Sequence, residues 1–502
     1  MKTLTSPLHD RPWLSDLLTL GAGAAMTLTF APFNAWWLAP LLMALVFTCA
    51  QRARVKRMLW RGWLFGVGLF GTGTSWVYVS IHDFGYTGAP LALFLTALFV
   101  ATLALFYMAM FGLYRFCRPR GLLNAWAFAG IWVIGELFRS WAFTGFPWLY
   151  LGSAQVDSPI NTLAPLGGVY LLSFVIALTG GLIARLVERR SWVAAVMVAL
   201  LWLSPSALPL EWAVPLDTPK SVALVQGDLA QLDKWTPSGQ RQAANTYASL
   251  TRRDADNAEI IVWPETALPM LEQQAIPFLE RMQATLDSDT TLITGLVQQD
   301  AKGHYFNSVI TLGDGHGVYK KAHLVPFGEY LPLDSLLRGL IDFFNLPMSD
   351  FKAGPSDPEP LHADGVSLGV AICYEIVYPD LVRQRAHSSD ALLTVSNDSW
   401  FGHSIGPLQH MQMARLRALE NNRYLLRATS NGLTAIVDST GKITAKAPRF
   451  EPAVLTGMVY PMKGMTPFTV LGSWPAGILA ALMVLTGALV RLVQKRKEAS
   501  AA

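Results

Sequence analysis

Cys373 is the residue of this chain best placed to act as a nucleophile. It closes the small and apolar run Gly369–Cys373, and two polar residues follow it directly. This pattern predicts a buried strand that ends in a sharp turn, so that the thiol is exposed at the edge of a sheet. Taken alone, a core cysteine is the simpler interpretation, because unpaired cysteines are often buried. The interpretation of Cys373 as a nucleophile therefore depends on whether activating side chains lie near it.

Two other segments carry side chains that can activate a thiol. An apolar strand pattern delivers Glu265 at its end, where Pro264 stops further strand pairing. The segment Tyr319–Glu329 carries Lys321 and then Glu329 on a short loop. A thiol of pKa about 8.5 needs a nearby base or cation: a carboxylate takes its proton, and an ammonium stabilises the thiolate and a developing oxyanion. A solvated surface ion pair is the ordinary alternative for Lys321 and Glu329.

Composition places these residues in a membrane protein. Of 502 residues, 52% are hydrophobic and 15% are charged, and the mean hydropathy is +0.34. Apolar stretches of roughly the length of a bilayer-spanning helix fill the first 215 residues and recur at the end. These eight candidate spans are Leu14–Phe30, Ala35–Ala50, Gly62–Ser80, Pro90–Leu113, Leu122–Phe138, Ile160–Leu186, Trp192–Ala213 and Phe468–Val490.

Positive charge in alternate loops predicts the orientation of the spans. The clusters are Lys2 and Arg11; Arg52, Arg54, Lys56, Arg57 and Arg61; Arg115, Arg118 and Arg120; Arg185, Arg189 and Arg190; and Arg491, Lys495, Arg496 and Lys497. By the positive-inside rule, both termini are cytoplasmic and the long insert between spans seven and eight lies outside the cytoplasm. The first stretch is interpreted as a retained span, because no A-x-A cleavage site follows it.

Residues of about 218–462 have a different character. Short β-rich runs alternate with polar or helical stretches, which is typical of an α/β domain. A duplicated strand set, packed as two sheets with helices outside (an αββα sandwich), suits this length. We therefore expect a membrane domain of seven helices at 1–215, an extracytoplasmic catalytic domain at 216–465, and an eighth helix with a basic cytoplasmic tail at 466–502.

Three motifs together carry a family resemblance. The runs WPET (263–266), YKKAHLVPFGE (319–329) and CYE (373–375) occur in this order. They resemble the nitrilase superfamily, whose members use a Glu–Lys–Cys triad and an α/β sandwich fold. With the spans, the single inserted domain and the loops at 73–80, 145–148 and 395–402, the whole chain is similar to the membrane-embedded apolipoprotein N-acyltransferase family.

The resemblance implies an activity and a role for each residue. Cys373 is the nucleophile that receives a fatty acyl chain from a phospholipid as a thioester, with ping-pong kinetics. Glu265 is the general base and Lys321 stabilises the oxyanion. Glu329, Tyr374 and Glu375 support them. The acceptor is the N-terminal amine of diacylglyceryl-cysteine on apolipoproteins, which gives the mature triacylated lipoprotein in the bacterial inner membrane. No cofactor or metal is implied, and we expect a monomer.

Aromatic and apolar residues are candidates for lipid contact. The segment Leu336–Leu346 is apolar and includes Phe343 and Phe344; it is interpreted either as an ordinary core helix or as an interfacial segment that handles lipid. Further candidates, which are core or belt aromatics in the simpler interpretation, are Phe146, Trp148, Trp235, Trp400 and Phe401.

Other functions fit the sequence less well. A membrane-tethered nitrilase-type amidase would use the same triad but has no need of eight spans. A non-catalytic lipid-binding or transport protein has no need of an intact triad. Ser396 and Asp398, with His403 or His410, suggest a serine hydrolase, but no G-x-S-x-G elbow precedes the serine. No phosphate-binding glycine loop, metal-ligand spacing, paired cysteine spacing or nucleic-acid-binding basic patch is present.

Overall fold

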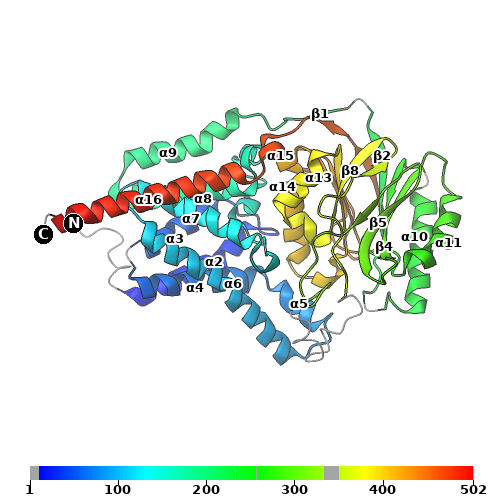
Figure 1. The fold of residues 1–502 in the computed structure, drawn as a ribbon, viewed down its shortest axis with the longest axis horizontal. Coiled ribbons are helices and arrows are strands. Elements are labelled where there is room, and N and C mark those ends of the chain that lie inside the picture. The colour runs from blue at the N-terminus through cyan, green and yellow to red at the C-terminus, as the bar shows by residue number, and fades with distance from the viewer. Residues whose placement is uncertain are drawn as a thin grey trace. The chain divides into compact units, whose positions relative to one another are not determined.

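The computed structural model describes residues 11–51, 53–216, 218–231, 233–255, 257–332 and 350–500. The chain divides into two compact units, which Figure 1 draws. The helical unit comprises the described residues of Met1–Tyr78, Pro90–Leu210 and Leu471–Ala502. The sheet unit comprises those of Val79–Ala89 and Glu211–Val470, so a short segment from the first part of the chain belongs to it.

The helical unit consists of α-helices joined by short 3-10 turns. Its helices are α2 (Pro12–Met26), α3 (Leu38–Ala50), α4 (Val55–Gly73), α6 (Ala89–Cys117), α7 (Leu123–Arg139), α8 (Ala164–Arg189), α9 (Trp192–Leu203) and α16 (Trp474–Ser500), and α5 (Trp76–His82) continues into the Val79–Ala89 segment. The 3-10 turns are η1 (Thr27–Thr29), η2 (Ala142–Thr144), η3 (Leu151–Gln155), η4 (Asn161–Leu163) and η5 (Ser204–Ala207).

Three helical segments among the described residues are long and apolar enough to cross a bilayer: Ala89–Cys117, Asn161–Arg189 and Trp474–Ser500. The pair α4 and α5, bent by 60°, makes a fourth if it is counted as one span. Helices α2, α3, α7 and α9 have 12–17 residues, which is shorter than a typical span. The expected eight spans therefore stay a prediction.

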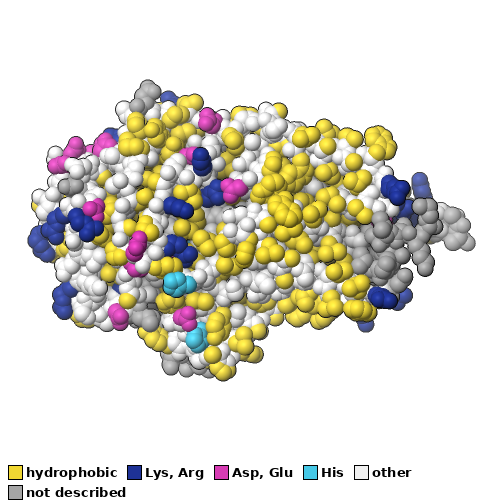
Figure 2. Space-filling view, turned by 180° about the vertical axis from the view of Figure 1, so that it is seen from behind, with side chains coloured by type: hydrophobic (Ala, Val, Ile, Leu, Met, Phe, Trp, Pro, Cys, Tyr) yellow, Lys and Arg dark blue, Asp and Glu magenta, His cyan; other side chains and the backbone are white. Residues whose placement is uncertain are grey.

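The long helices differ in how much apolar surface they expose. The most apolar window of Asn161–Arg189 is 83% buried, whereas those of α6 and α16 are 28% and 22% buried. Hydrophobic side chains cover much of the helical unit on the face drawn in Figure 2. The exposed ones include Phe94 and Leu98 of α6 and Leu482 and Leu485 of α16. This distribution is the one expected when α8 forms the core of a helix bundle and the outer helices face lipid.

The sheet unit contains two six-stranded sheets with the same internal plan. In each, three parallel strands are flanked by antiparallel ones. The first sheet has the order β13 (Ala453–Val459), β2 (Lys220–Gln226), β3 (Ile260–Val262), β4 (Thr291–Gln299), β5 (Tyr305–Gly313) and β6 (Val318–Lys320). The second has the order β12 (Ile443–Lys446), β11 (Ala435–Val437), β10 (Leu425–Thr429), β9 (Ala391–Ser396), β8 (Val366–Ile372) and β7 (Leu361–Ala363). A separate pair joins β1 (Val214–Pro215) to β14 (Met462–Lys463).

The two sheets pack face to face between outer helices, as the sequence predicts. Alternate residues of β2 show this: Val222 and Leu224 belong to the core between the sheets, whereas Ala223 and Val225 pack in the core that includes helix residues. The outer helices are α10 (Pro237–Asp254) and α11 (Glu272–Gln283) on the first sheet, and α13 (Pro379–His387) and α14 (Gly406–Asn421) on the second. Strands that are buried on both faces consist mainly of apolar residues. Such continuous apolar runs can be recognised in the sequence as buried strands.

Strand β10 carries a charged residue in its buried interior. Arg427 lies at its centre, fully buried, and a charged residue in the middle of a short run argues against a buried strand. The structure pairs this guanidinium with the carboxylate of Asp398, at 2.9 Å from Nη2 to Oδ2.

Gly295 of β4 allows the turn that carries Glu265 to lie against the sheet. A Cβ atom at this position would come within 2.5 Å of the Thr266 nitrogen and 2.6 Å of the Pro264 carbonyl oxygen. We expect Gly295→Ala to lower stability by about 1–3 kcal/mol because backbone atoms must shift to admit the methyl group. The thermal unfolding midpoint of the detergent-solubilised protein measures this. Gly88→Ala is the control, since a Cβ there meets no atom within 4 Å; equal midpoints for both variants would contradict the prediction.

Candidate active site

Cys373 occupies the first position after β8 and begins the 3-10 turn η7 (Cys373–Val377). Its backbone φ of 52° lies in the left-handed region, which costs a non-glycine residue roughly 1–2 kcal/mol. Its neighbour Ile372 is fully buried, whereas Cys373 is partly exposed. The sharp turn thus leaves Cys373 partly exposed at the edge of the core between the sheets, as the strand-to-turn pattern predicts.

Lys321 lies immediately after β6 with its side chain almost completely buried. Its Nζ is 2.9 Å from Oε1 and 2.8 Å from Oε2 of Glu329, and 3.6 Å from Oε1 of Glu265. Burial alone would lower the pKa of Lys321, but the two carboxylates outweigh it and hold the pKa above its ordinary value. The residue is therefore a permanent buried cation, and not half of a solvated ion pair.

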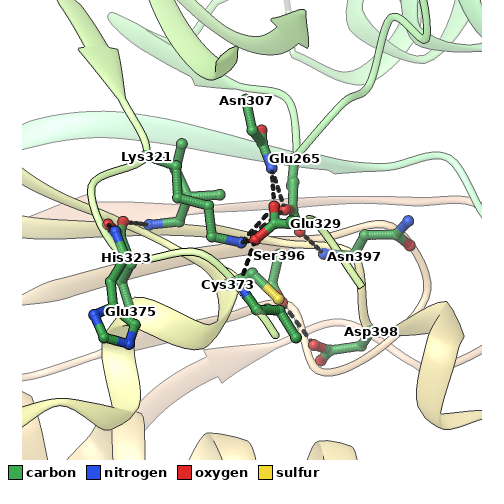
Figure 3. A network of polar contacts seen from close by, with 12 residues as sticks. Glu265, Asn307, Lys321, His323, Glu329, Cys373, Glu375, Ser396, Asn397 and Asp398 are labelled. Atoms are coloured by element: carbon green, nitrogen blue, oxygen red, sulfur yellow. Dashed lines mark hydrogen bonds and ion pairs between the residues drawn. The ribbon is translucent and has the colours of Figure 1, made fainter. Parts of the chain in front are cut away.

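The two carboxylates are fixed by amide groups. The Asn307 side-chain amide donates to Oε1 of Glu265 at 2.8 Å and to Oε1 of Glu329 at 2.9 Å. The backbone N–H of Asn397 donates to Oε2 of Glu265 at 2.7 Å, and that of Val325 donates to Oε2 of Glu329 at 2.8 Å. Figure 3 shows Glu265, Lys321, Glu329 and Cys373 converging from separate elements. Rigid carboxylates around one ammonium are what a proton-transfer site requires.

The charge around Cys373 determines the protonation of its thiol. Burial raises the pKa of the Cys373 thiol above its ordinary value, and the negative charge of Glu265 raises it further. The positive charge of Lys321 opposes this rise. The thiol is consequently protonated at neutral pH. Nucleophilic attack then requires that the proton be removed during the reaction, and Glu265 is the adjacent carboxylate.

Glu375 supports the site without facing the reaction. Its Oε2 accepts from the Ile372 N–H at 2.7 Å and from the Tyr319 hydroxyl at 2.8 Å. Its Oε1 accepts from the N–H groups of Ala322 at 2.7 Å and His323 at 2.9 Å. This carboxylate therefore connects the turn after β8 to the segment that carries Lys321, and four donors satisfy it in a fully buried position.

The predicted aromatic residues of the sheet unit have different surroundings. The ring of Tyr374 packs edge-on against Tyr378, 5.3 Å between centroids. Trp400 and Phe401 lie in η8 (Asp398–Phe401). The Trp400 ring contacts Phe84 of the Val79–Ala89 segment at 5.9 Å, and its carbonyl oxygen accepts from Ser80.

Trp235 borders a mostly apolar cavity of about 190 Å³ that Met270, Val297 and Phe351 also line. The remaining predicted lipid contacts do not belong to the described part of the sheet unit. Phe146 and Trp148 belong to the helical unit, where their rings stack 6.3 Å apart and Arg139 donates to both carbonyl oxygens. Phe343 and Phe344 lie outside the described residues.

Asn307 and Lys234 were missed by the sequence prediction. Asn307 is a buried amide inside the apolar strand β5, and that break in the strand pattern was the available signal. Lys234 is buried with its Nζ 3.4 Å from the Thr266 carbonyl oxygen. Burial lowers the pKa of Lys234 to about 8, and the charge of Glu265 opposes the fall. Nothing in the sequence distinguishes this lysine from a surface one.

The serine hydrolase alternative finds no support in the geometry. The Ser396 hydroxyl donates to Oδ1 of Asp398 at 2.7 Å, and Nε2 of His410 lies 3.1 Å from the backbone carbonyl oxygen of Cys373. Among the described residues, no group of three or more His, Cys, Asp or Glu side chains is arranged to hold a metal ion.

Two family models match this chain. Residues 22–182 match the family described as "Apolipoprotein N-acyltransferase N-terminal domain", and residues 221–461 match "Carbon-nitrogen hydrolase". Among solved structures, a carbon-nitrogen hydrolase from Helicobacter pylori G27 is similar at 19% identity and a TM-score of 0.36, over 51% of this chain and 94% of that one.

Two curated relatives match nearly the whole chain, and both are named apolipoprotein N-acyltransferase. The protein from Pseudomonas paraeruginosa strain PA7 is 45% identical over 97% of this chain and 98% of its own length. The protein from Azotobacter vinelandii is 44% identical over 96% of each chain. With these two relatives, a carbon-nitrogen hydrolase domain and apolar helices, the chain belongs to the apolipoprotein N-acyltransferase family of bacterial membrane enzymes.

Proposed function

We propose that this enzyme transfers a fatty acyl chain from a phospholipid, through a thioester on Cys373, to the N-terminal amine of diacylglyceryl-cysteine on apolipoproteins. The observation that carries the proposal is the single partly exposed thiol beside a buried ammonium that lies 3.6 Å from Glu265. The names of the relatives support the lipoprotein acceptor.

In the first half-reaction, Cys373 attacks the ester carbonyl carbon of the phospholipid while Glu265 takes the thiol proton. The Lys321 ammonium donates to the oxyanion of the tetrahedral intermediate. When this intermediate collapses, the ester C–O bond breaks and Glu265 returns the proton to the departing alkoxide. The products are an acyl thioester on Cys373 and a lysophospholipid.

In the second half-reaction, the neutral amine of the acceptor attacks the thioester carbonyl carbon. Glu265 accepts a proton from the attacking nitrogen, Lys321 again stabilises the oxyanion, and the C–S bond breaks. The proton passes to the departing sulfur, which restores the thiol and leaves an amide on the acceptor. One base and one cation thus serve both steps. Glu329 holds the ammonium, at 2.8 Å, so that it does not leave the site.

We expect Cys373→Ala to abolish acyl transfer while the protein stays folded, and Cys373→Ser to be severely impaired, because a serine hydroxyl is a poorer nucleophile at neutral pH. Mass spectrometry of the wild-type protein incubated with phospholipid should find an acyl mass on the peptide that contains Cys373. Cys49→Ala and Cys117→Ala are matched controls, since both thiols are buried in the helical unit. Full activity of Cys373→Ala would contradict the proposal.

Glu265→Gln should change thiol reactivity and acyl transfer in opposite directions. The Glu265 charge raises the pKa of Cys373, so its removal lowers that pKa and increases the thiolate fraction at any given pH. Alkylation by iodoacetamide should therefore show a midpoint at lower pH than in the wild type. Acyl transfer should fall by about 10²–10⁴-fold because the general base is lost. A midpoint at higher pH, or undiminished acyl transfer, would rule out the assigned role.

We also propose that the chain crosses the bacterial inner membrane eight times as a monomer, with both termini in the cytoplasm and the sheet unit outside it. The alternation of basic loops supports this orientation. Green fluorescent protein fused after Ala502 should fluoresce, and alkaline phosphatase fused after Ala213 should be active. An active phosphatase fused after Ala502 would reverse the proposed orientation.

A further inference from the structure

A buried polar cluster lies on the far side of the nucleophile's turn, and neither half-reaction uses it. It consists of His410 from α14, Asp398 after β9 and Arg427 from β10, each at most 1% exposed. Burying a cation and an anion costs several kcal/mol per ion before their attraction is counted. The cluster reaches the backbone of the reacting residue through His410, whose Nε2 lies 3.1 Å from the carbonyl oxygen of Cys373.

The contacts define the tautomer of His410. Nη2 of Arg427 lies 3.0 Å from Nδ1 of His410, and 2.9 and 3.1 Å from the carboxylate oxygens of Asp398. A guanidinium only donates hydrogen bonds, so Nδ1 must accept. In a neutral imidazole the proton then resides on Nε2, which faces a carbonyl oxygen that only accepts. One tautomer therefore satisfies both ring nitrogens.

The charges around the imidazole favour its neutral form. Burial lowers the pKa of His410, and the positive charge of Arg427 lowers it further, whereas Asp398 opposes the fall. Asp398 is itself occupied by Arg427 and by the Ser396 hydroxyl at 2.7 Å. The distance from Oδ1 of Asp398 to Nδ1 of His410 is 3.3 Å, which is longer than the contacts of Asp398 with Arg427 and Ser396. The Phe401 ring covers another side of the imidazole, 6.0 Å between centroids.

We infer that His410 is a positioning residue, whose Nε2–H holds the Cys373 carbonyl and thereby keeps the sulfur aligned with Glu265 and Lys321. Arg427 and Asp398 fix the tautomer that makes this donor available. A left-handed residue persists only where surrounding contacts hold it, and Cys373 has a φ of 52°. The hydrogen bond from the Ile372 N–H to Glu375 restrains the turn before the cysteine, and His410 restrains it after. The inference rests on the proposed role of Cys373 as nucleophile.

Two amide variants separate the donor from the rest of the cluster. In His410→Gln the side-chain amide reaches the position of Nε2 and retains a donor for the Cys373 carbonyl. In His410→Asn the shorter side chain places its amide at the level of Nδ1. This variant therefore keeps an acceptor for Arg427 but has no donor that reaches the Cys373 carbonyl oxygen. We expect His410→Asn to lower kcat for acyl transfer by about 10–100-fold because the nucleophile is misplaced, with KM for phospholipid unchanged. His410→Gln should recover most of the lost rate.

The same variants test whether the effect is positional or electrostatic. Alkylation of Cys373 by iodoacetamide needs no alignment with Glu265 or Lys321, so its pH midpoint should be the same in the wild type and in both variants. Equal losses of acyl transfer in the two variants, an unchanged rate in His410→Asn, or a shifted alkylation midpoint would each overturn the inference.

A second measurement uses the wild-type chain and does not depend on whether the variants fold. Solid-state NMR of protein labelled with ¹³C at cysteine carbonyls and ¹⁵N in histidine rings should detect a dipolar coupling between the Cys373 carbonyl and a protonated Nε2. The Nδ1 of the same ring should be unprotonated. A missing coupling or a protonated Nδ1 would overturn the assignment. This readout is independent of the thioester, so the absence of an acyl adduct on Cys373 would refute the proposed chemistry and leave the tautomer result standing.

Discussion

The arrangement of this site depends on one buried ammonium. Lys321 is 1% exposed, and an unpaired buried cation would cost several kcal/mol. Glu329 and Glu265 supply the compensating charge, and Asn307 ties the two carboxylates together. Because these residues follow or lie on different strands of one sheet, the requirement to neutralise the ammonium also brings two carboxylates and an amide to one place.

The cluster of opposite charges also explains why the thiol is not a thiolate at rest. One cation shared between two carboxylates leaves the surroundings of Cys373 net negative, and burial adds to the cost of a second anion near Glu265. A permanently ionised thiol would be reactive toward any electrophile, whereas a protonated one is a weak nucleophile. In the proposed mechanism, the thiol becomes reactive only when Glu265 takes its proton.

Two buried polar groups hold the turn that carries Cys373. Glu375 gathers four donors from both sides of the turn and the neighbouring loop, and His410 meets the Cys373 carbonyl from helix α14, which packs on the same sheet as β8. Polar groups so deeply buried are stable only when every contact is made. A strained backbone at the reacting residue is therefore compatible with a rigid site. The helical unit meets a different requirement, because its outer helices α6 and α16 expose leucine and phenylalanine side chains suited to lipid.

The sequence by itself determined the local features: apolar strands with alternate faces, the abrupt end of the run before Cys373, and the motifs that carry Glu265 and Lys321. These follow from short-range periodicity and backbone chemistry. Only the tertiary structure decided which polar residues complete the site. Asn307 lies 42 residues from Glu265 in sequence, and His410 lies 37 residues from Cys373. Arg427 lies inside a buried strand, and its partner Asp398 comes from a different element. Such pairings depend on strand order and helix placement, and no local pattern encodes which buried charges will meet.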